Sequence, residues 1–164
     1  MKKNIVIFGN GKHANIIFDE LDRLKKYNIL GFVTKTNLIK YRKKNYKFDD
    51  FYKKFKDKNI KGIIGIGDNN LRKKIAIEIE KLFPGFKWEI LISKDAIVSR
   101  RAKIGKGTAI ISGSVININT NIGKHCLINT KSTIDHDNSW GDFSSCGPGV
   151  NSAGSVKVKE FSHV

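Results

Sequence analysis

The second half of the chain repeats every six residues, and this period restricts the possible folds more than any other feature of the sequence. Every sixth position is aliphatic as far as Ile134, and the same step runs on to the last residue. These column positions are Val98, Ile104, Ile110, Ile116, Ile122, Ile128, Ile134, Trp140, Cys146, Ser152, Val158 and Val164. Helices repeat every 3.6 residues and strands every 2, so neither explains a period of six. The repeat predicts a triangular β-solenoid with about 18 residues per coil and the column residues stacked inside.

Two further sets of residues keep the same period. Small residues stand two places before the column: Ala96, Ala102, Thr108, Ser114, Thr120, Cys126, Ser132, Asn138 and Ser144. Directly after it come Gly105, Asn117, Gly123, Asn129, Asp135, Gly141 and Gly147. Glycine and asparagine, and to a lesser degree aspartate, tolerate backbone conformations that other residues avoid. We therefore expect this second set to form the corners of the coil.

The first residues predict a Rossmann-like unit. A short apolar run, 4–8, ends at Gly9-Asn10-Gly11-Lys12-His13-Ala14, and apolar residues then keep helical spacing to about Lys26. Glycines let a ligand approach the backbone, and the helix N-terminus offers free N–H groups to phosphate. A dinucleotide site also needs an acidic residue after the second strand. That strand, 29–33, is followed by Thr34, which disfavours NAD.

The next segment predicts the remainder of a small α/β domain. Residues 37–61 form a connection rich in lysine and aromatic residues, with a short helix around 49–55. A buried strand over 62–67 is followed by a helix with Asp68, Asn69 and Asn70 as its cap and an apolar face made by Leu71, Ile75, Ile79 and Leu82. Another strand-like run covers 87–92.

These elements divide the chain into two predicted domains. Residues 1–92 form the α/β domain, with a parallel sheet of three or four strands, and residues 93–164 form the solenoid, whose repeat begins near Ala96.

The charge of the chain, +16, leaves two interpretations open. Aromatic residues interleave with lysines in Tyr41-Arg42-Lys43-Lys44 and Lys53-Lys54-Phe55-Lys56, as they do in some single-strand binders. The excess, however, is mostly lysine spread along the chain, which favours a solvated surface over a nucleic-acid footprint. A positive field also suits small substrates that carry phosphates. We expect no nucleic-acid partner.

Composition also bears on compartment, thiols and metals. With no apolar run near 18 residues and no cleavage site after Met1, we expect a soluble cytoplasmic protein without a membrane partner. Cys126 and Cys146 then favour buried free thiols over a disulfide. The two cysteines and four histidines lack the spacing of metal ligands, so no metal is expected.

Two places in the sequence could carry chemistry. Gly9, Asn10, Gly11, Lys12 and His13 would bind a phosphate-bearing ligand at the edge of the sheet, or form a structural turn. Gly67 and Asp68 end a neighbouring strand and could line the same pocket.

The second place is Asp135-His136-Asp137, where the histidine points away from the column. Flanking carboxylates can fix the tautomer of His136 and make it a more basic general base. An exposed polar corner is the alternative. For His125 and His163 we favour surface roles.

These motifs together resemble those of one bacterial acetyltransferase family. A Gly-x-Gly-x-His turn precedes repeats that contain IGKHCLINTKSTIDHD, GDF and PG. The family comprises nucleotide-sugar N-acetyltransferases and sialic acid O-acetyltransferases. The resemblance spans the chain and implies a Rossmann-like α/β domain followed by a left-handed parallel β-helix, assembled as a homotrimer. Acetyl-CoA, the acetyl donor, would lie between adjacent β-helices, and the nucleotide sugar between the N-terminal domain of one subunit and the β-helix of its neighbour.

The resemblance also implies roles for individual residues. His136 matches the general base that deprotonates the sugar amine or hydroxyl, and Asp137 the acidic residue that orients it. Gly154 matches the glycine whose N–H stabilises the oxyanion, and Gly9, Gly11 and His13 the turn that holds the phosphates. The implied function is N-acetylation of a nucleotide-linked amino sugar for surface glycans. The alternatives are O-acetylation of sialic acid and a catalytically impaired trimeric protein that binds sugar nucleotides.

The chain departs from the family pattern at several positions. Ser145 stands where a histidine that contacts cofactor or substrate is usual, and Thr34 where an acidic residue helps to hold the nucleotide base. Trp140, Cys146 and Ser152 replace aliphatic residues of the column. The chain stops at Val164, where relatives continue for another coil or two, so we expect a shortened copy.

Overall fold

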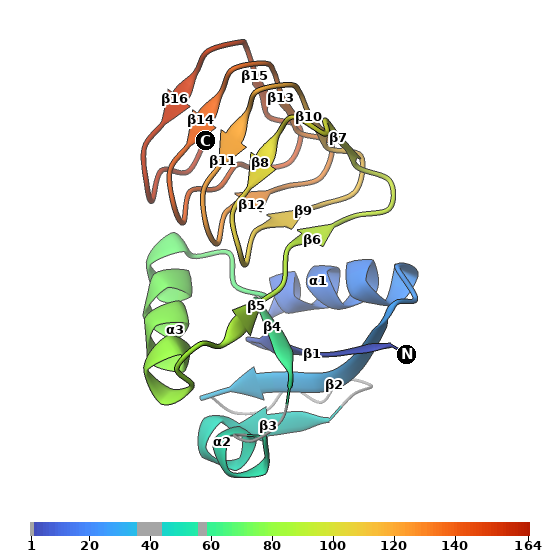
Figure 1. Ribbon diagram of the computed structural model, residues 1–164, viewed down its shortest axis with the longest axis vertical. Coiled ribbons are helices and arrows are strands. Elements are labelled where there is room, and N and C mark those ends of the chain that lie inside the picture. The colour runs from blue at the N-terminus through green and yellow to red at the C-terminus, as the bar shows by residue number, and fades with distance from the viewer. Residues whose placement is uncertain (1, 36–43, 56–58) are drawn as a thin grey trace.

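The computed structural model describes residues 2–35, 44–55 and 59–164, with the side chain of Tyr52 left out. It confirms the predicted fold class, an α/β domain followed by a parallel β-helix that stands on it (Figure 1). Residues 37–43 and 56–58 of the predicted basic connection, with most of the segment 41–44, lie outside the described residues. No helix of the described part is long and apolar enough to cross a membrane.

The α/β domain holds a parallel sheet with the order β3-β2-β1-β4-β5. Its elements are β1 (Lys3–Phe8), α1 (Lys12–Arg23), β2 (Tyr27–Thr34), β3 (Asn45–Lys47), α2 (Phe48–Phe55), β4 (Lys61–Ile64), α3 (Asn69–Leu82) and β5 (Lys87–Trp88). The predicted helix around 49–55 is confirmed as α2. The prediction of three or four strands was wrong, because β3 is a short polar strand without an apolar pattern.

The central strand β1 shows why this sheet is covered on both faces. Its four residues from Ile5 to Phe8 are fully buried. Ile5 and Ile7 belong to the core under α1, whereas Val6 and Phe8 belong to the core shared with α2 and α3. Since successive side chains of a strand point to opposite faces, a continuous apolar run is what a doubly covered parallel strand requires.

The helix α3 buries only part of the face predicted for it, because Ile79 is buried as expected but Leu71 and Leu82 are not. Leu71 and Leu82 are 44% and 39% exposed, whereas Arg72, Ala76 and Ile79 are buried. Arg72 can be buried because its guanidinium donates hydrogen bonds to main-chain carbonyl groups of the β-helix. These carbonyls belong to His125, Phe143 and Ser144. Burial lowers the pKa of Arg72 to about 10, so the guanidinium remains charged at neutral pH and ties α3 to the β-helix.

The β-helix consists of short rungs in three parallel sheets. The strands are β6 (Leu91–Ile92), β7 (Ile97–Val98), β8 (Lys103–Ile104), β9 (Ala109–Ile110), β10 (Val115–Ile116), β11 (Asn121–Ile122), β12 (Leu127–Ile128), β13 (Thr133–Ile134), β14 (Ser139–Trp140), β15 (Asn151–Ser152) and β16 (Lys157–Val158). The sheets are ordered β15-β13-β10-β7, β16-β14-β11-β8 and β12-β9-β6. Val115 pairs with Ile97, a step of 18 residues, which confirms the predicted coil length.

The column and the small residues before it are buried as predicted in the middle of the β-helix, whereas Val98, Ile104, Ser152 and Val158 are half-buried and Val164 is 51% exposed. Ile110 to Cys146 form the core of the β-helix at steps of six, and Trp140 is only 2% exposed. The pairing stays in register beyond the irregular positions, because β13 pairs with β15 and β14 with β16. Cys126 and Cys146 are buried free thiols.

The predicted corner residues do lie at the corners, but they do not adopt the left-handed conformation there. Left-handed backbone occurs two positions later, at Gly107, Gly113, Asn119, His125, Lys131, Asp137, Phe143, Gly149, Ser155 and Phe161. Gly105, Gly123 and Gly141 are needed for a different reason. A Cβ atom on Gly105 would lie 2.5 Å from the carbonyl carbon of Gly123, because successive coils approach closely at this corner.

The strand predicted over 87–92 is two strands that belong to different sheets. β5 pairs with β4 of the α/β domain, whereas β6 pairs with β9 of the β-helix. The first rung therefore starts at Leu91, before the predicted start near Ala96. The sheet that begins with β6 packs on α1, since Ala109, Ile111 and Leu127 share one core with Ile17 and Leu21.

Candidate active site

His136 lies at the corner between β13 and β14, with an exposed side chain. The next residue, Asp137, is left-handed (φ 58°), and its Oδ2 lies 2.8 Å from Nδ1 of His136. Asn119, one coil earlier, donates to the other oxygen of Asp137 at 3.1 Å. Because an ionised carboxylate only accepts hydrogen bonds, Nδ1 of the neutral ring carries the proton and Nε2 is left free to act as a base.

The charges around His136 make it more basic. The hydrogen bond to Asp137, followed by the charge of Asp135, raises the pKa of His136 above its ordinary value. The pKa values of both carboxyl groups are lowered. Asp135 accepts from the backbone N–H of His136 and from Asn117, and Asp137 accepts from the imidazole of His136. The trio fits the demands on a general base that works near neutral pH.

Gly154 comes to His136 from the next coil, 18 residues later. The N–H of Ser155 donates to the carbonyl oxygen of His136 at 2.9 Å. A Cβ atom on Gly154 would lie 2.6 Å from Cε1 and 2.7 Å from Nε2 of His136. Glycine at this position therefore lets the backbone pass directly against the edge of the ring that carries the free nitrogen.

The N–H of Gly154 differs from its equivalents on earlier coils. Asn117 caps the N–H of Ile118, and Asp135 caps that of His136, each through a side-chain oxygen. The corresponding residue on this coil is Ala153, whose side chain has no acceptor. Within the described residues, the N–H of Gly154 donates no hydrogen bond. A backbone donor without a partner among the described residues thus lies beside the edge of the His136 ring that carries Nε2.

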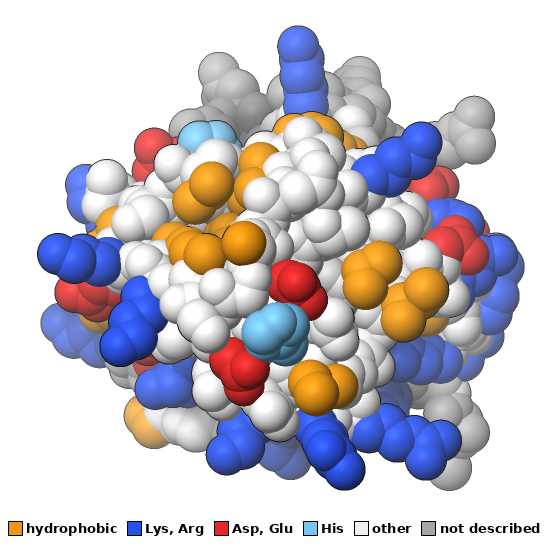
Figure 2. Space-filling view, turned by 90° about the horizontal axis from the view of Figure 1, so that it is seen from above, with side chains coloured by type: hydrophobic (Ala, Val, Ile, Leu, Met, Phe, Trp, Pro, Cys, Tyr) orange, Lys and Arg blue, Asp and Glu red, His pale blue; other side chains and the backbone are white. Residues whose placement is uncertain are grey.

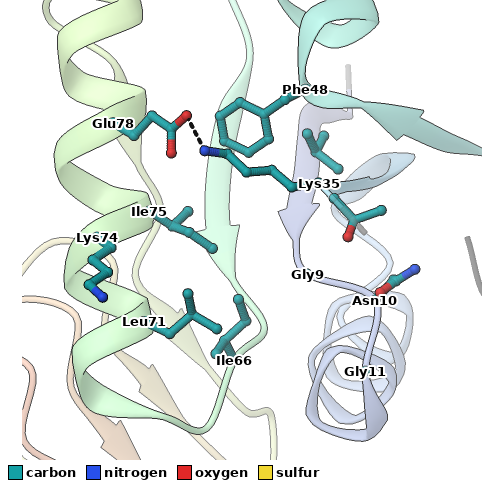
Figure 3. A pocket seen from close by; sticks show the side chains of 12 residues that line it. Gly9, Asn10, Gly11, Lys35, Phe48, Ile66, Leu71, Lys74, Ile75 and Glu78 are labelled. Atoms are coloured by element: carbon teal, nitrogen blue, oxygen red, sulfur yellow. Dashed lines mark ion pairs between the residues drawn. The ribbon is translucent and has the colours of Figure 1, made fainter. Parts of the chain in front are cut away.

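The glycine turn lines a cavity of about 480 Å³ at the edge of the sheet (Figure 3). Gly9 has φ 106°, and a Cβ atom there would lie 2.7 Å from Cγ1 of Ile66. Gly11 caps α1 without a side-chain hydrogen bond, so the first N–H groups of α1 are available to an anion. Nδ2 of Asn10 is buried and has no hydrogen-bond partner among the described residues.

The rest of this first cavity is apolar with charged groups at one side. Leu71, Ile75 and Ile66 project into it from α3 and the preceding loop (Figure 3). Lys35 and Glu78 form an ion pair of 2.5 Å, and the Lys35 ammonium also lies 5.2 Å from the ring centre of Phe48. The mixture of aromatic, apolar and cationic groups suits a nucleotide.

The sequence predicts that the glycine turn 9–13, Gly67 and Asp68 line one pocket, but the structure distributes these residues between two cavities. His13, Gly67 and Asp68 line a second cavity of about 480 Å³ between the two domains. Lys12 is exposed and is among the lining residues of neither cavity. Asp68 caps α3 as predicted, accepting the N–H of Leu71 at 2.7 Å. Burial and then the charge of Arg72 lower the pKa of His13 to about 4, so it is neutral and brings no charge to a phosphate.

The surface role expected for His125 was wrong. This residue is 2% exposed, and burial lowers its pKa to about 4. Its ring stacks on Phe143 at 5.0 Å, and Phe143 stacks on Phe161 at 5.7 Å. The three residues are 18 apart, so the coil period could have revealed this aromatic stack. No group of residues that could bind a metal occurs in the described part of the chain.

Known proteins resemble this chain both in the α/β domain and over the whole fold. The model of the PglD N-terminal domain matches residues 4–79. The structure of PerB from Caulobacter crescentus in complex with CoA and GDP-perosamine is 27% identical, with a TM-score of 0.89 over 98% of this chain and 76% of that one. The chain is therefore similar, in sequence and in fold, to bacterial hexapeptide-repeat sugar N-acetyltransferases.

Two other solved structures share the fold of this chain. The acetyltransferase domain of PglB from Neisseria gonorrhoeae FA1090, in complex with acetyl coenzyme A, is 23% identical, with a TM-score of 0.90. The alignment covers 100% of this chain and 80% of that one. WeeI from Acinetobacter baumannii AYE is 19% identical, with a TM-score of 0.85 over 96% and 76% of the two chains.

In this chain, His136 and the two cavities lie at opposite ends of the molecule. The sheet β12-β9-β6 faces α1, whereas His136 lies at the corner where the other two sheets meet (Figure 1). That corner is on the side of the β-helix away from the α/β domain. On the face viewed from above, lysine and arginine gather around the margin, whereas acidic side chains, a histidine and hydrophobic side chains lie nearer the centre (Figure 2). One chain therefore does not bring its own His136 to its own cavities.

Proposed function

We propose that this chain transfers the acetyl group of acetyl-CoA to the amine of a nucleotide-linked amino sugar, in the biosynthesis of bacterial surface glycans. The observation that carries the proposal is the free Nε2 of His136 beside the free N–H of Gly154. One group accepts a proton and the other stabilises negative charge on oxygen, which are the two demands of acyl transfer to an amine.

His136, Asp137 and Gly154 would each have a separate role in acetyl transfer from acetyl-CoA. Acetyl-CoA supplies an activated thioester, so positioning, one base and one oxyanion donor can suffice. His136 accepts a proton from the attacking nitrogen as the C–N bond forms, and Asp137 holds the imidazolium that results. The N–H of Gly154 donates to the carbonyl oxygen as its charge grows. The C–S bond breaks, and the proton on His136 leaves with the CoA sulfur.

The first cavity supports the choice of a nucleotide-linked acceptor. The uncapped start of α1 offers N–H groups to the diphosphate, and the buried Nδ2 of Asn10 offers one more donor. Phe48 and the apolar residues of α3 suit a nucleobase.

The separation of the two sites supports a homotrimer in which neighbouring subunits share the acceptor. The N-terminal domain of one subunit would hold the nucleotide, and His136 of the next would meet the amine. Apolar side chains at the far end of the molecule fit an interface, since Ile97 is 67% exposed and Ile118, next to Asn119, is 41% exposed.

An assay of CoA release tests the proposal. Purified protein would be given acetyl-CoA with UDP-linked and GDP-linked amino sugars, and with free sialic acids, while thiol release is followed. We expect thiol release with an amino-sugar nucleotide, and a product heavier by one acetyl group on nitrogen. Acetylation of sialic acid alone, or binding of sugar nucleotides without any transfer, would contradict it.

The raised pKa of His136 predicts a particular pH profile. The base must be unprotonated, so kcat/KM falls as pH decreases through the pKa of His136, which lies above its ordinary value. Replacing Asp137 by Asn removes the largest cause of the rise. The acidic limb should then move to lower pH, and kcat/KM at neutral pH should fall by about tenfold or more. Asp19→Asn, at an exposed position of α1, is the matched control and should leave the profile unchanged.

A further inference from the structure

A chain of hydrogen bonds runs from the buried face of α3 to the second cavity. Arg72 donates to Oδ1 of Asn69 at 2.7 Å, and the amide nitrogen of Asn69 donates to the carbonyls of Phe161 and Ser162. The hydroxyl of Ser145 also donates to Oδ1 of Asn69 at 2.8 Å. Arg72, Asn69 and Ser145 are all buried. The chain therefore has a fixed direction that begins at a charged, fully bonded guanidinium.

This direction fixes the tautomer of His163. Nδ1 of His163 lies 2.8 Å from Oγ of Ser145. The single proton of that hydroxyl is already given to Asn69, so the serine oxygen must accept from His163. Nδ1 then carries the proton of the neutral ring, and Nε2 is left as an acceptor. His163 is exposed, as expected for a surface residue, and its ring lines the second cavity in a fixed orientation.

The lining of the second cavity indicates what it binds. Its polar groups include the imidazoles of His13 and His163, the amides of Asn70 and Asn129 and the carboxylate of Asp68. No lysine or arginine occurs among its described lining residues. Side chains that donate and accept hydrogen bonds, without a cationic group to hold a phosphate, match the hydroxyl groups of a sugar. By contrast, the first cavity has Lys35 and Lys74.

The two cavities are suitably placed for one elongated ligand. Gly11 and Ile66 line the first cavity, whereas His13 and Gly67, which follow them closely in the sequence, line the second. Both cavities thus flank the same two loops at the edge of the sheet.

We infer that the second cavity binds the sugar of the acceptor, with Nε2 of His163 accepting a hydrogen bond from a sugar hydroxyl. This inference rests on the proposed function, because it takes the ligand of the first cavity to be the nucleotide of the same molecule. His163 is in this account a binding and positioning residue, and Ser145 is the residue that orients it.

Nitrogen-15 NMR of the histidine rings tests the orientation without any ligand. At alkaline pH, wild-type His163 should show the Nδ1–H tautomer. In Ser145→Ala it should return to the Nε2–H tautomer that free histidine prefers, while His136 keeps its wild-type signals. An Nε2–H tautomer for wild-type His163 would overturn the inference.

Calorimetry tests the ligand, with GDP, GDP-perosamine, UDP and a UDP-linked amino sugar as the compounds titrated. Wild type should bind one sugar nucleotide more tightly than its nucleoside diphosphate. His163→Ala should weaken that sugar nucleotide by about tenfold and leave the diphosphate within about twofold. His163→Gln, which keeps a polar group near the place of Nε2, should restore binding, and His163→Asn, which keeps only the near nitrogen, should not.

The outcomes separate this inference from the proposed function. If His163→Ala keeps the wild-type advantage of the sugar nucleotide, the second cavity does not hold the sugar, and the proposed function stands. If wild type binds none of the four compounds, the proposed function fails and the inference fails with it.

Discussion

Replacing His136 by Ala lowers the turnover of acetyl transfer by about 10²–10⁴, the range for loss of a general base. The structure gives the reason: Asp137 holds the proton on Nδ1, and Nε2 is the free nitrogen next to Gly154. Alanine removes both nitrogens but keeps the turn, since the main-chain bond from Ser155 does not involve the side chain.

The measurement is kcat for CoA release with saturating substrates, together with the Kd of acetyl-CoA and of the sugar nucleotide. Both affinities should stay near wild type, because no hydrogen bond of the imidazole holds either cavity together. Lys157→Ala, at an exposed position of β16, is the control for general effects of substitution. Wild-type turnover in His136→Ala would rule out the assigned base.

Replacing Ala153 by Asn lowers turnover by about 10²–10³, as expected when one oxyanion donor is lost. Asn117 and Asp135 occupy the equivalent positions on the two earlier coils, and each caps the following N–H. An asparagine at 153 should cap the N–H of Gly154 in the same way and so remove it from the reaction. The fold should be unharmed, because the new side chain continues an existing ladder.

Ala153→Leu is the matched control, since leucine has nearly the shape of asparagine but no acceptor. Its turnover should stay within a few fold of wild type, and thermal unfolding should show both variants to be folded. Equal losses in the two variants would mean that bulk at this position, rather than capture of the N–H, causes the defect.

The column of the β-helix could be predicted from sequence because burial repeats with the coil. Every rung places one side chain inside, so Ile110, Ile116 and Ile122 show the period directly. The positions of left-handed backbone at the corners could not be predicted from residue type, since Lys131 and Phe143 adopt this conformation as well as Gly107. There the geometry of the coil, rather than the preference of the residue, decides the conformation.

The candidate site also has one part that the sequence could predict and one part that it could not. His136 and Asp137 are adjacent in the sequence, so their pairing was accessible to pattern and resemblance. The division of the turn residues between two cavities depends on how α3 packs on the β-helix. That packing rests on Arg72, a residue type that is rarely buried, so no pattern of apolar residues revealed it.

The central claim is that the base and the acceptor site of one reaction come from different subunits, and mixed trimers test it most directly. His136→Ala lacks the base. Gly11→Glu places a carboxylate where the diphosphate is expected, and a Cβ atom on Gly11 meets nothing within 4 Å, so the fold has room for it. Each variant alone should be nearly inactive. Co-expressed with different tags and purified through both, they should form trimers in which one of the three sites has both functional halves, and so recover about one third of wild-type activity. Mixed trimers as inactive as the two parents would contradict the claim.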